Sequence, residues 1–187
     1  MEPVCVPEST VRFMMYWTAA TMALVLASPA WAASQRDRHD CEANDPDRSI
    51  AACTRILQGR GETAQNRAKA YYNRGNAWRG KGEYDRAITD YSEAIRLNPK
   101  HTDAYYDRGV AWRDKGALDK AIGDYSEVIR LDPKDATAFF NRAIASFFDG
   151  SIPKAVADFS QASELDPKDP YPKDFQIDYI RVYSRSP

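Results

Sequence analysis

One stretch of this 187-residue chain returns at a fixed interval, and that repetition constrains the fold more than any other feature. The sequence YYNRGNAWRGKG at 71–82 recurs as YYDRGVAWRDKG at 105–116, an interval of 34 residues. The same interval separates three prolines, Pro99, Pro133 and Pro167. The unit therefore occurs three times between Ala68 and Asp169. Tandem units of this length are typical of arrays in which each unit contacts only its neighbours.

Each unit has the pattern of two helices. Its aromatic, aliphatic and small residues recur every three or four positions, as on one face of a helix. In the first unit these residues are Tyr71, Gly75 and Trp78, then Ile88, Tyr91 and Ile95. A glycine stands where each first helix should end, at Gly82, Gly116 and Gly150, and the residue before each proline disfavours the helical region and ends the second helix. The sequence predicts an all-α solenoid of helical hairpins.

The unit resembles the tetratricopeptide repeat, whose 34-residue signature is W-x2-L-G-x2-Y, then A-x3-F, then P. The matching residues are Tyr71, Arg74, Gly75, Trp78, Ala87, Tyr91 and Pro99; then Tyr105, Arg108, Gly109, Trp112, Ala121, Tyr125 and Pro133; then Phe139, Arg142, Ala143, Ser146, Ala155, Phe159 and Pro167. The third copy departs most, with Ala143 in place of glycine and Ser146 in place of an aromatic residue. The resemblance implies stacked hairpins with a continuous groove.

The repeats divide the chain into six segments. We expect a signal peptide at 1–32, a lead-in and degenerate half repeat at 33–67, three repeats at 68–101, 102–135 and 136–169, and a C-terminal capping segment at 170–187. The capping segment carries Phe175, Tyr179 and Val182 at helical spacing. A helix with that spacing can cover the apolar face that a terminal repeat otherwise exposes to water.

An arginine replaces the family's leucine in every copy, on the face of the first helix that should be packed. An unpaired buried charge is costly, and each unit also has an aspartate just before the aromatic residue of its second helix. We therefore predict three structural ion pairs, Arg74 with Asp90, Arg108 with Asp124, and Arg142 with Asp158. The alternative is that the arginines bind an acidic ligand.

The resemblance also implies which residues face the groove. The first helices should present Tyr72, Asn73, Asn76 and Arg79; then Tyr106, Asp107, Val110 and Arg113; then Phe140, Asn141, Ile144 and Phe147. We call these twelve residues the groove face. It is polar at its start and apolar at its end, which suits an extended peptide or a partner helix. Alternatively, Tyr72 and Asn73 are ordinary repeat residues and Phe147 packs under the C-terminal segment.

The N-terminus has features of an export signal. Residues 13–27 form an uncharged, mostly apolar run, and Ala30 and Ala32 after it give a small-x-small cleavage pattern. We expect removal of the leader after Ala32 and a location in the periplasm, with anchoring in the inner membrane by an uncleaved leader as the alternative. The basic n-region is weak, so Met14 or Met15 is a candidate for the true start.

Two cysteines remain after the expected cleavage, Cys41 and Cys53. An exported chain favours a disulfide between them, which would close the incomplete hairpin of the half repeat, whose first helix we expect to be only a few residues around Cys41. The alternatives are two reduced, buried thiols or a metal site with His39, although no paired cysteine or histidine spacing supports a metal.

Composition and motifs favour a binding protein over an enzyme. The formal net charge is −1 with no basic stripe, which argues against nucleic acid as a partner. No phosphate loop, serine elbow or metalloprotease motif occurs, so we expect no catalytic residue, metal or cofactor. We predict a scaffold or assembly factor that binds a protein or peptide client. The alternative is a structural protein that acts through self-association of its repeats.

Overall fold

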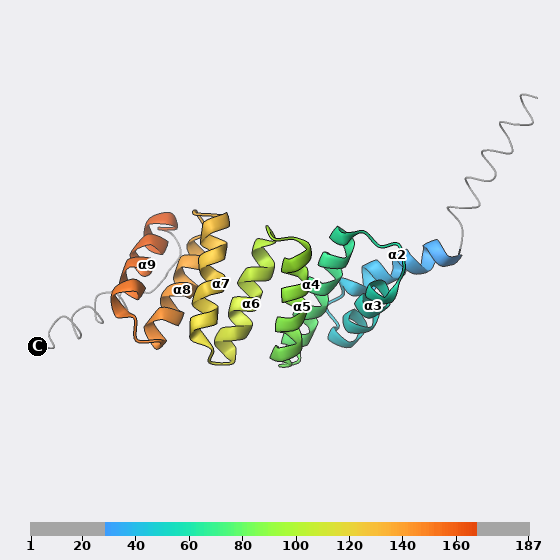
Figure 1. Ribbon diagram of the computed structural model, residues 1–187, viewed down its shortest axis with the longest axis horizontal. Helices are drawn as coiled ribbons and strands as arrows, with labels where there is room; N and C mark the ends of the chain where they lie inside the picture. The colour runs from blue at the N-terminus through green and yellow to red at the C-terminus, as the bar shows by residue number, and fades with distance from the viewer. Residues whose placement is uncertain (1–28, 168–187) are drawn as a thin grey trace, which may run out of the picture.

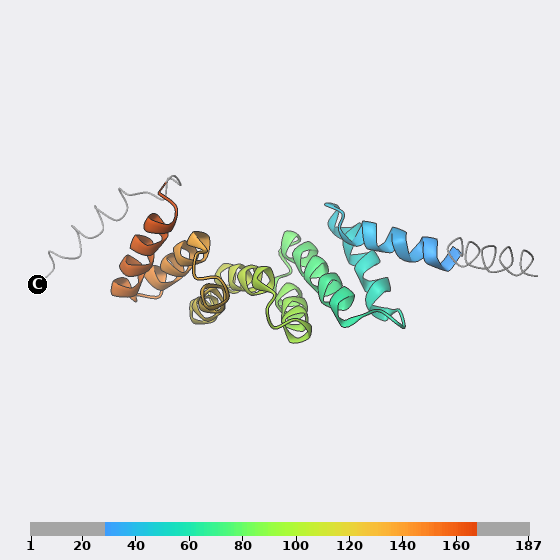
Figure 2. The same cartoon turned by 90° about the horizontal axis from the view of Figure 1, so that it is seen from above.

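The computed structural model describes residues 29–167, which form eight helices joined by short turns (Figure 1). The helices are α2 Pro29–Cys41, α3 Pro46–Gln58, α4 Ala64–Gly80, α5 Tyr84–Leu97, α6 Thr102–Asp114, α7 Leu118–Leu131, α8 Ala136–Phe148 and α9 Ile152–Leu165. Successive helices pair and stack along one axis, so that the described chain is an elongated array (Figure 2). This is the predicted all-α solenoid. Among these residues, no helix is both long and apolar enough to cross a membrane.

The turns within the hairpins form where the glycines predicted them. Gly82, Gly116 and Gly150 adopt φ values of 75°, 79° and 85°, a region that residues with a side chain enter only at a cost. After the first of these, the Glu83 amide donates back to the Trp78 carbonyl at 3.0 Å, and the chain then enters α5. The second helices end at a leucine two residues before each proline, as the restriction on the residue preceding proline requires.

A tyrosine of the second helix packs on a glycine of the first helix and forms the centre of each of the first two repeats. Tyr91 and Tyr125 are completely buried. A Cβ atom on Gly75 would lie 2.7 Å from the ring of Tyr91, and one on Gly109 would lie 2.9 Å from the ring of Tyr125. A side chain at either glycine would therefore push the two helices apart.

The N-terminal hairpin differs from the prediction. We expected a first helix of only a few residues around Cys41, but α2 has 13 residues, the same length as α6 and α8. Its sequence has no apolar stripe that could have revealed it. A disulfide from Cys41 and ion pairs attach it to α3, since Asp37 lies 2.7 Å from Arg55 and Asp40 lies 2.6 Å from Arg48.

Two predicted segments lie outside the described residues. These are the leader up to residue 28, which includes the candidate starts at Met14 and Met15, and the capping segment at 170–187. The expected cleavage point after Ala32 falls within α2. The predicted repeat boundaries at 102 and 136 coincide with the first residues of α6 and α8, whereas α4 begins earlier than residue 68, at Ala64, where the Thr63 hydroxyl accepts from the Asn66 amide.

Candidate partner-binding surface

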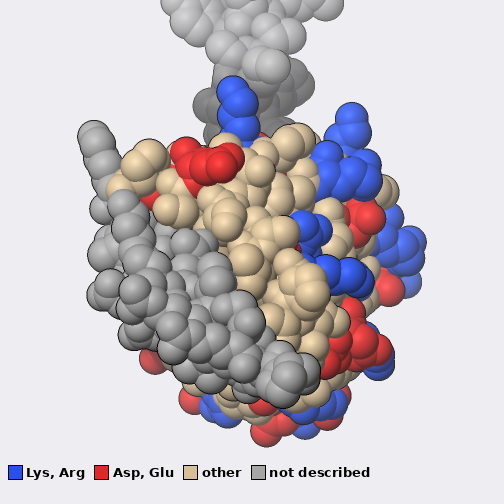
Figure 3. Space-filling model, turned by 90° about the vertical axis from the view of Figure 1, so that its left-hand side faces the viewer, with Lys and Arg blue, Asp and Glu red and all other residues tan. Residues whose placement is uncertain are grey.

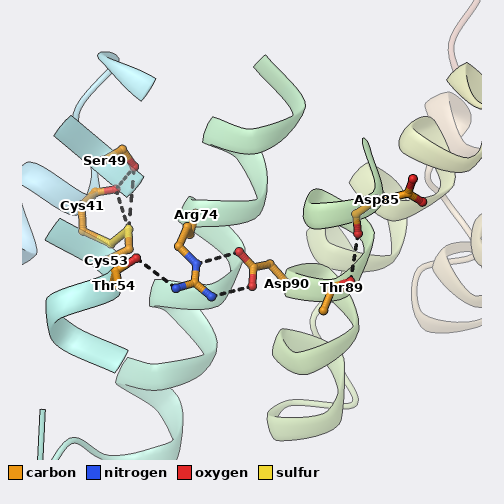
Figure 4. A network of polar contacts seen from close by, with 8 residues as sticks. All are labelled: Cys41, Ser49, Cys53, Thr54, Arg74, Asp85, Thr89 and Asp90. Atoms are coloured by element: carbon orange, nitrogen blue, oxygen red, sulfur yellow. Dashed lines mark hydrogen bonds and ion pairs between the residues drawn. A yellow bond between two sulfur atoms is a disulfide. The ribbon is translucent and has the colours of Figure 1, made fainter. Parts of the chain in front are cut away.

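The three repeat arginines point into the interior and each binds its predicted aspartate through two parallel bonds. The Nε and Nη2 atoms of Arg74 lie 2.8 Å from the two carboxylate oxygens of Asp90 (Figure 4). The corresponding distances are 2.8 and 2.7 Å for Arg108 with Asp124, and 2.7 and 2.7 Å for Arg142 with Asp158. This fork geometry is the strongest form of the arginine–carboxylate contact.

A third bond from each arginine reaches the preceding second helix. The Nη1 atom of Arg74 donates to the hydroxyl of Thr54 at 3.0 Å, and those of Arg108 and Arg142 donate to Ser92 and Ser126 at 2.9 and 3.0 Å. Each guanidinium therefore links three helices. These bonds occupy all three nitrogens, which favours a structural role over binding of an acidic ligand.

A disulfide joins Cys41 at the end of α2 to Cys53 in α3, with Cα atoms 4.8 Å apart. Both cysteines are buried, and they pack with Ala52 and Ile56. The Ser49 hydroxyl donates to the Cys41 carbonyl at 2.9 Å (Figure 4). Within residues 29–167, no group of three or more histidine, cysteine, aspartate or glutamate side chains could hold a metal ion.

Residues of the groove face bond to one another across two repeat junctions. At the first junction the Tyr72 hydroxyl donates to Asp107 at 2.8 Å, and Arg79 lies 3.5 Å from the same carboxylate. At the second junction Asn141 takes the place of the aspartate: its amide nitrogen donates to the Tyr106 hydroxyl at 2.9 Å, and its amide oxygen accepts from Arg113 at 3.0 Å. Many predicted groove residues are thus already bonded to one another.

The two junctions differ in charge. Burial raises the pKa of Asp107, while the hydroxyl of Tyr72 and the charge of Arg79 oppose that shift. Burial also raises the pKa of Tyr72 to about 12. The carboxylate of Asp107 is therefore partly shielded from water, and Tyr72 and Arg79 offset part of the cost of burying its negative charge.

The two buried tyrosines also differ in their contact with the groove face. The Tyr91 hydroxyl donates to the amide oxygen of Asn76 at 2.7 Å. The residue corresponding to Asn76 in the next repeat is Val110, which cannot accept a hydrogen bond, and the Tyr125 hydroxyl has no partner among the described residues. Val110 itself is buried, so this part of the predicted groove face belongs to the core.

At its C-terminal end the groove face becomes apolar. The ring of Phe140 lies 5.6 Å from that of Phe159, and the ring of Phe147 lies 5.3 Å from that of Phe148. Ile144, which lies between Phe140 and Phe147 in the sequence, is half-buried, whereas Phe148 is 70% exposed. Seen from this end, the described surface has a broad area without charged residues (Figure 3).

The surface is hollowed at its N-terminal end. A cavity of about 280 Å³ lies where the turn between α2 and α3 meets α4. It is lined by Cys41, Glu42, Ala43, Asn44, Pro46, Ser49, Asn73, Asn76, Ala77 and Gly80. A smaller hollow of about 90 Å³ shares Cys41, Glu42 and Asn73 with the cavity and is also lined by Arg38 and Lys69. Sequence reasoning named Asn73 and Asn76 but missed the wall from Cys41 to Ser49, because it took the groove residues from the first helices of the three full repeats alone.

Comparison with known proteins agrees with this architecture. A tetratricopeptide repeat model matches residues 72–136 and 119–170, together just over half of the chain. The chain is similar to the crystal structure of MamA, with 31% identity, a TM-score of 0.61, and 66% of this chain and 70% of that one covered.

Two further structures share the fold. MamA 41-end from Desulfovibrio magneticus RS-1 is 20% identical over 73% of this chain and 77% of that chain, with a TM-score of 0.66. The second TPR of Spaghetti (RPAP3), bound to the HSP90 peptide SRMEEVD, is 28% identical over 53% of this chain and 92% of that one, with a TM-score of 0.51. No curated protein sequence matches. The chain belongs to the tetratricopeptide repeat family, whose members are in general interaction modules rather than catalysts.

Proposed function

We propose that this protein is a non-catalytic scaffold or assembly factor that holds a segment of a partner protein on its groove face. The cavity beside Asn73 and Asn76 is the observation that carries the proposal. The cavity is lined on one side by α4, the first helix of the first full repeat, and its size suits one or two side chains of a partner.

The lining of the cavity suits a peptide. Asn76 is already engaged, because its amide oxygen accepts from Tyr91 and its side chain also contacts the Tyr72 hydroxyl, so Asn73 is the asparagine that a ligand can reach more readily. Within residues 29–167, the amide nitrogen of Asn73 makes a single long contact of 3.9 Å, with the sulfur of Cys41, for which a peptide carbonyl can compete. The bound HSP90 peptide of the similar Spaghetti structure supports the same use of the fold.

We further propose that the protein works after export, in the periplasm, because of the apolar N-terminal run and the disulfide between Cys41 and Cys53. Cleavage after Ala32 would leave a helix that starts at Ala33. The alternative is attachment to the inner membrane through an uncleaved leader. The near-neutral charge supports a protein partner rather than nucleic acid.

Self-association is a second candidate function. Phe148 is 70% exposed at the apolar end, and two such ends could pair. Sedimentation over a range of concentrations separates the two functions, because a scaffold without its partner should remain a monomer.

The proposal can be tested by filling the cavity. Gly80 lines it, and a Cβ atom there meets nothing within 4 Å, so Gly80→Phe should occupy the cavity without disturbing α4. Gly123 in α7 has equally open surroundings and lies outside the cavity, so Gly123→Phe is the matched control.

Tagged chains carrying either substitution are then cross-linked and purified from the cells that make the protein. A partner that is recovered with the wild type and with Gly123→Phe, and lost with Gly80→Phe, supports the proposal. Recovery of the same partner with all three chains contradicts it, and recovery of the protein alone favours self-association.

A further inference from the structure

The disulfide between Cys41 and Cys53 lies against the cavity beside Asn73 and Asn76, and Cys41 is itself a lining residue. Ser49, a second lining residue, donates to the Cys41 carbonyl at 2.9 Å, and its hydroxyl lies 3.7 Å from the sulfur of Cys53 (Figure 4). The amide nitrogen of Asn73, a third lining residue, lies 3.9 Å from the sulfur of Cys41. The cavity is thus built in part from the disulfide and from two residues that contact it.

One wall of the cavity is the turn between α2 and α3. It consists of Glu42, Ala43 and Asn44, which we call the turn wall. The backbone amide of Glu42 donates to the His39 carbonyl at 3.2 Å, and that of Ala43 donates to the Asp40 carbonyl at 3.2 Å. Both acceptors belong to the last turn of α2. The turn wall therefore continues α2, and its position follows the position of that helix.

The described attachments of α2 are weak apart from the disulfide. Among residues 35–41, whose side chains are described, Asp40 and Cys41 alone are buried. The ion pairs from α2 to α3 go to Arg48 and Arg55, whose side chains are 57% and 54% exposed. Ion pairs with partners this exposed contribute little to stability. The disulfide is therefore the strongest described connection between α2 and α3.

Helix α3 and the opposite wall of the cavity have attachments that do not involve the disulfide. Ile56 and Leu57 of α3 are buried in one cluster with Ala70 of α4. Arg74 of α4 donates to the hydroxyl of Thr54 in α3 at 3.0 Å. The opposite wall lies on α4, which also pairs with α5. Reduction of the disulfide should therefore release α2 and the turn wall, while α3 and α4 stay in place.

We propose that the partner site is redox-dependent: the cavity forms when Cys41 and Cys53 are joined, and it is lost when they are thiols. This inference rests on the proposed function, because it concerns the same cavity, and it adds the condition under which that cavity exists. A chain whose two cysteines are still reduced has folded repeats but cannot hold a partner at this site.

The oxidation requires an oxidant that carries a disulfide. The thiolate of one cysteine attacks a sulfur of the oxidant, which forms a mixed disulfide and releases one thiol, and the thiolate of the other cysteine then displaces the second thiol. The two cysteines lose two electrons and two protons, and the disulfide of the oxidant becomes two thiols. By reciprocity, a partner at the cavity should shift this equilibrium toward the disulfide by the factor by which the disulfide strengthens partner binding.

The first test needs no partner. Hydrogen exchange of the purified full chain is measured by mass spectrometry before and after reduction with dithiothreitol. We expect the amides of Glu42 and Ala43 to exchange at least about tenfold faster after reduction, and those in residues 52–57 and in α4 to change less than about threefold. Reoxidation with oxidised glutathione should restore slow exchange.

Two results of the exchange experiment overturn the proposal. A smaller acceleration in the turn wall would mean that the wall stays in place without the disulfide. Equal acceleration throughout α3 and α4 would mean that the array unfolds more widely and does not lose one wall selectively.

The second test measures the partner. The photo-reactive residue p-benzoylphenylalanine replaces Asn73 in the otherwise wild-type chain, in the double variant Cys41→Ala, Cys53→Ala, and in Arg142→Met. The control Arg142→Met weakens the last repeat by leaving Asp158 without its partner, and it keeps the disulfide. After irradiation of cells, the adduct with a second protein should fall at least about tenfold in the double variant and stay within about twofold in the control.

An adduct of wild-type intensity from the double variant overturns the redox dependence, and so does an equal loss in the control. Absence of the adduct from every chain, the wild type included, contradicts the proposed function instead. The exchange experiment then decides by itself whether the cavity depends on the disulfide.

Discussion

The unpaired hydroxyl of Tyr125 leads to a prediction in which one substitution has opposite effects in two repeats. Tyr125→Phe removes a buried hydroxyl that has no described partner, and leaving such a group unpaired costs about 1–3 kcal/mol. The ring itself stays in place over Gly109. We expect Tyr125→Phe to stabilise the protein by about 1 kcal/mol.

The same substitution at the same repeat position should be destabilising in the first repeat. Tyr91→Phe removes a hydrogen bond of 2.7 Å to Asn76, which contributes about 0.5–1.5 kcal/mol. Asn76 is only half-buried, so water can replace part of the lost contact. The two variants should therefore differ by about 1–3 kcal/mol in the free energy of unfolding.

Urea unfolding followed by circular dichroism measures this difference, with a thermal scan as a second reading, in which about 1 kcal/mol moves the midpoint by about 2–4 °C for a chain of this size. The denaturant slope must be the same for both variants, because a repeat array can lose cooperativity. Equal destabilisation by Tyr125→Phe and Tyr91→Phe would refute the reasoning and would mean that an ordered water satisfies the Tyr125 hydroxyl.

Three further predictions concern the contacts that join the helices. Arg108→Met leaves the carboxylate of Asp124 buried without its partner and should cost about 3–5 kcal/mol in urea unfolding, and replacing Asp124 by Leu as well should restore most of that loss. Burial raises the pKa of Asp107, so the folded chain binds this proton more tightly than the unfolded chain and the carboxylate lowers stability as the pH rises. The stability of Asp107→Asn relative to wild type should thus increase between about pH 4 and pH 7, and a constant difference would contradict this. Cys53→Ser, which breaks the bond to Cys41, should cost about 2–3 kcal/mol and speed hydrogen exchange in the N-terminal hairpin but not in the last two helices.

The sequence predicts the hairpins well because one local cause fixes each boundary. Gly82 ends a first helix through a left-handed backbone, and Pro99 ends a second helix through its effect on the preceding residue. The pairing of Arg74 with Asp90 was predictable for a related reason, since two opposite charges recur in every copy at positions that must be packed. Repetition supplies three independent instances of each signal.

The parts that the sequence did not predict depend on contacts between elements. Helix α2 was expected to be short because a disulfide at its end and ion pairs along it, and not an apolar stripe, attach it to α3. The role of Asp107 as a shared partner of Tyr72 and Arg79 requires the distance between two repeats, which the period alone does not give. The burial of Val110 was missed for the same reason, because the family's pattern places it on the groove face without showing how closely the repeats pack.

Position-specific photo-cross-linking in living cells tests most directly whether a partner lies on the groove face. The photo-reactive residue replaces Asn73, beside the cavity, or Thr89, which is exposed on α5 outside the groove face, and the adducts are compared after irradiation. We predict that Asn73 gives an adduct with a second protein, that Thr89 does not, and that filling the cavity with Gly80→Phe abolishes the adduct. The same adduct from both positions, or adducts only with other copies of this chain, would contradict the account.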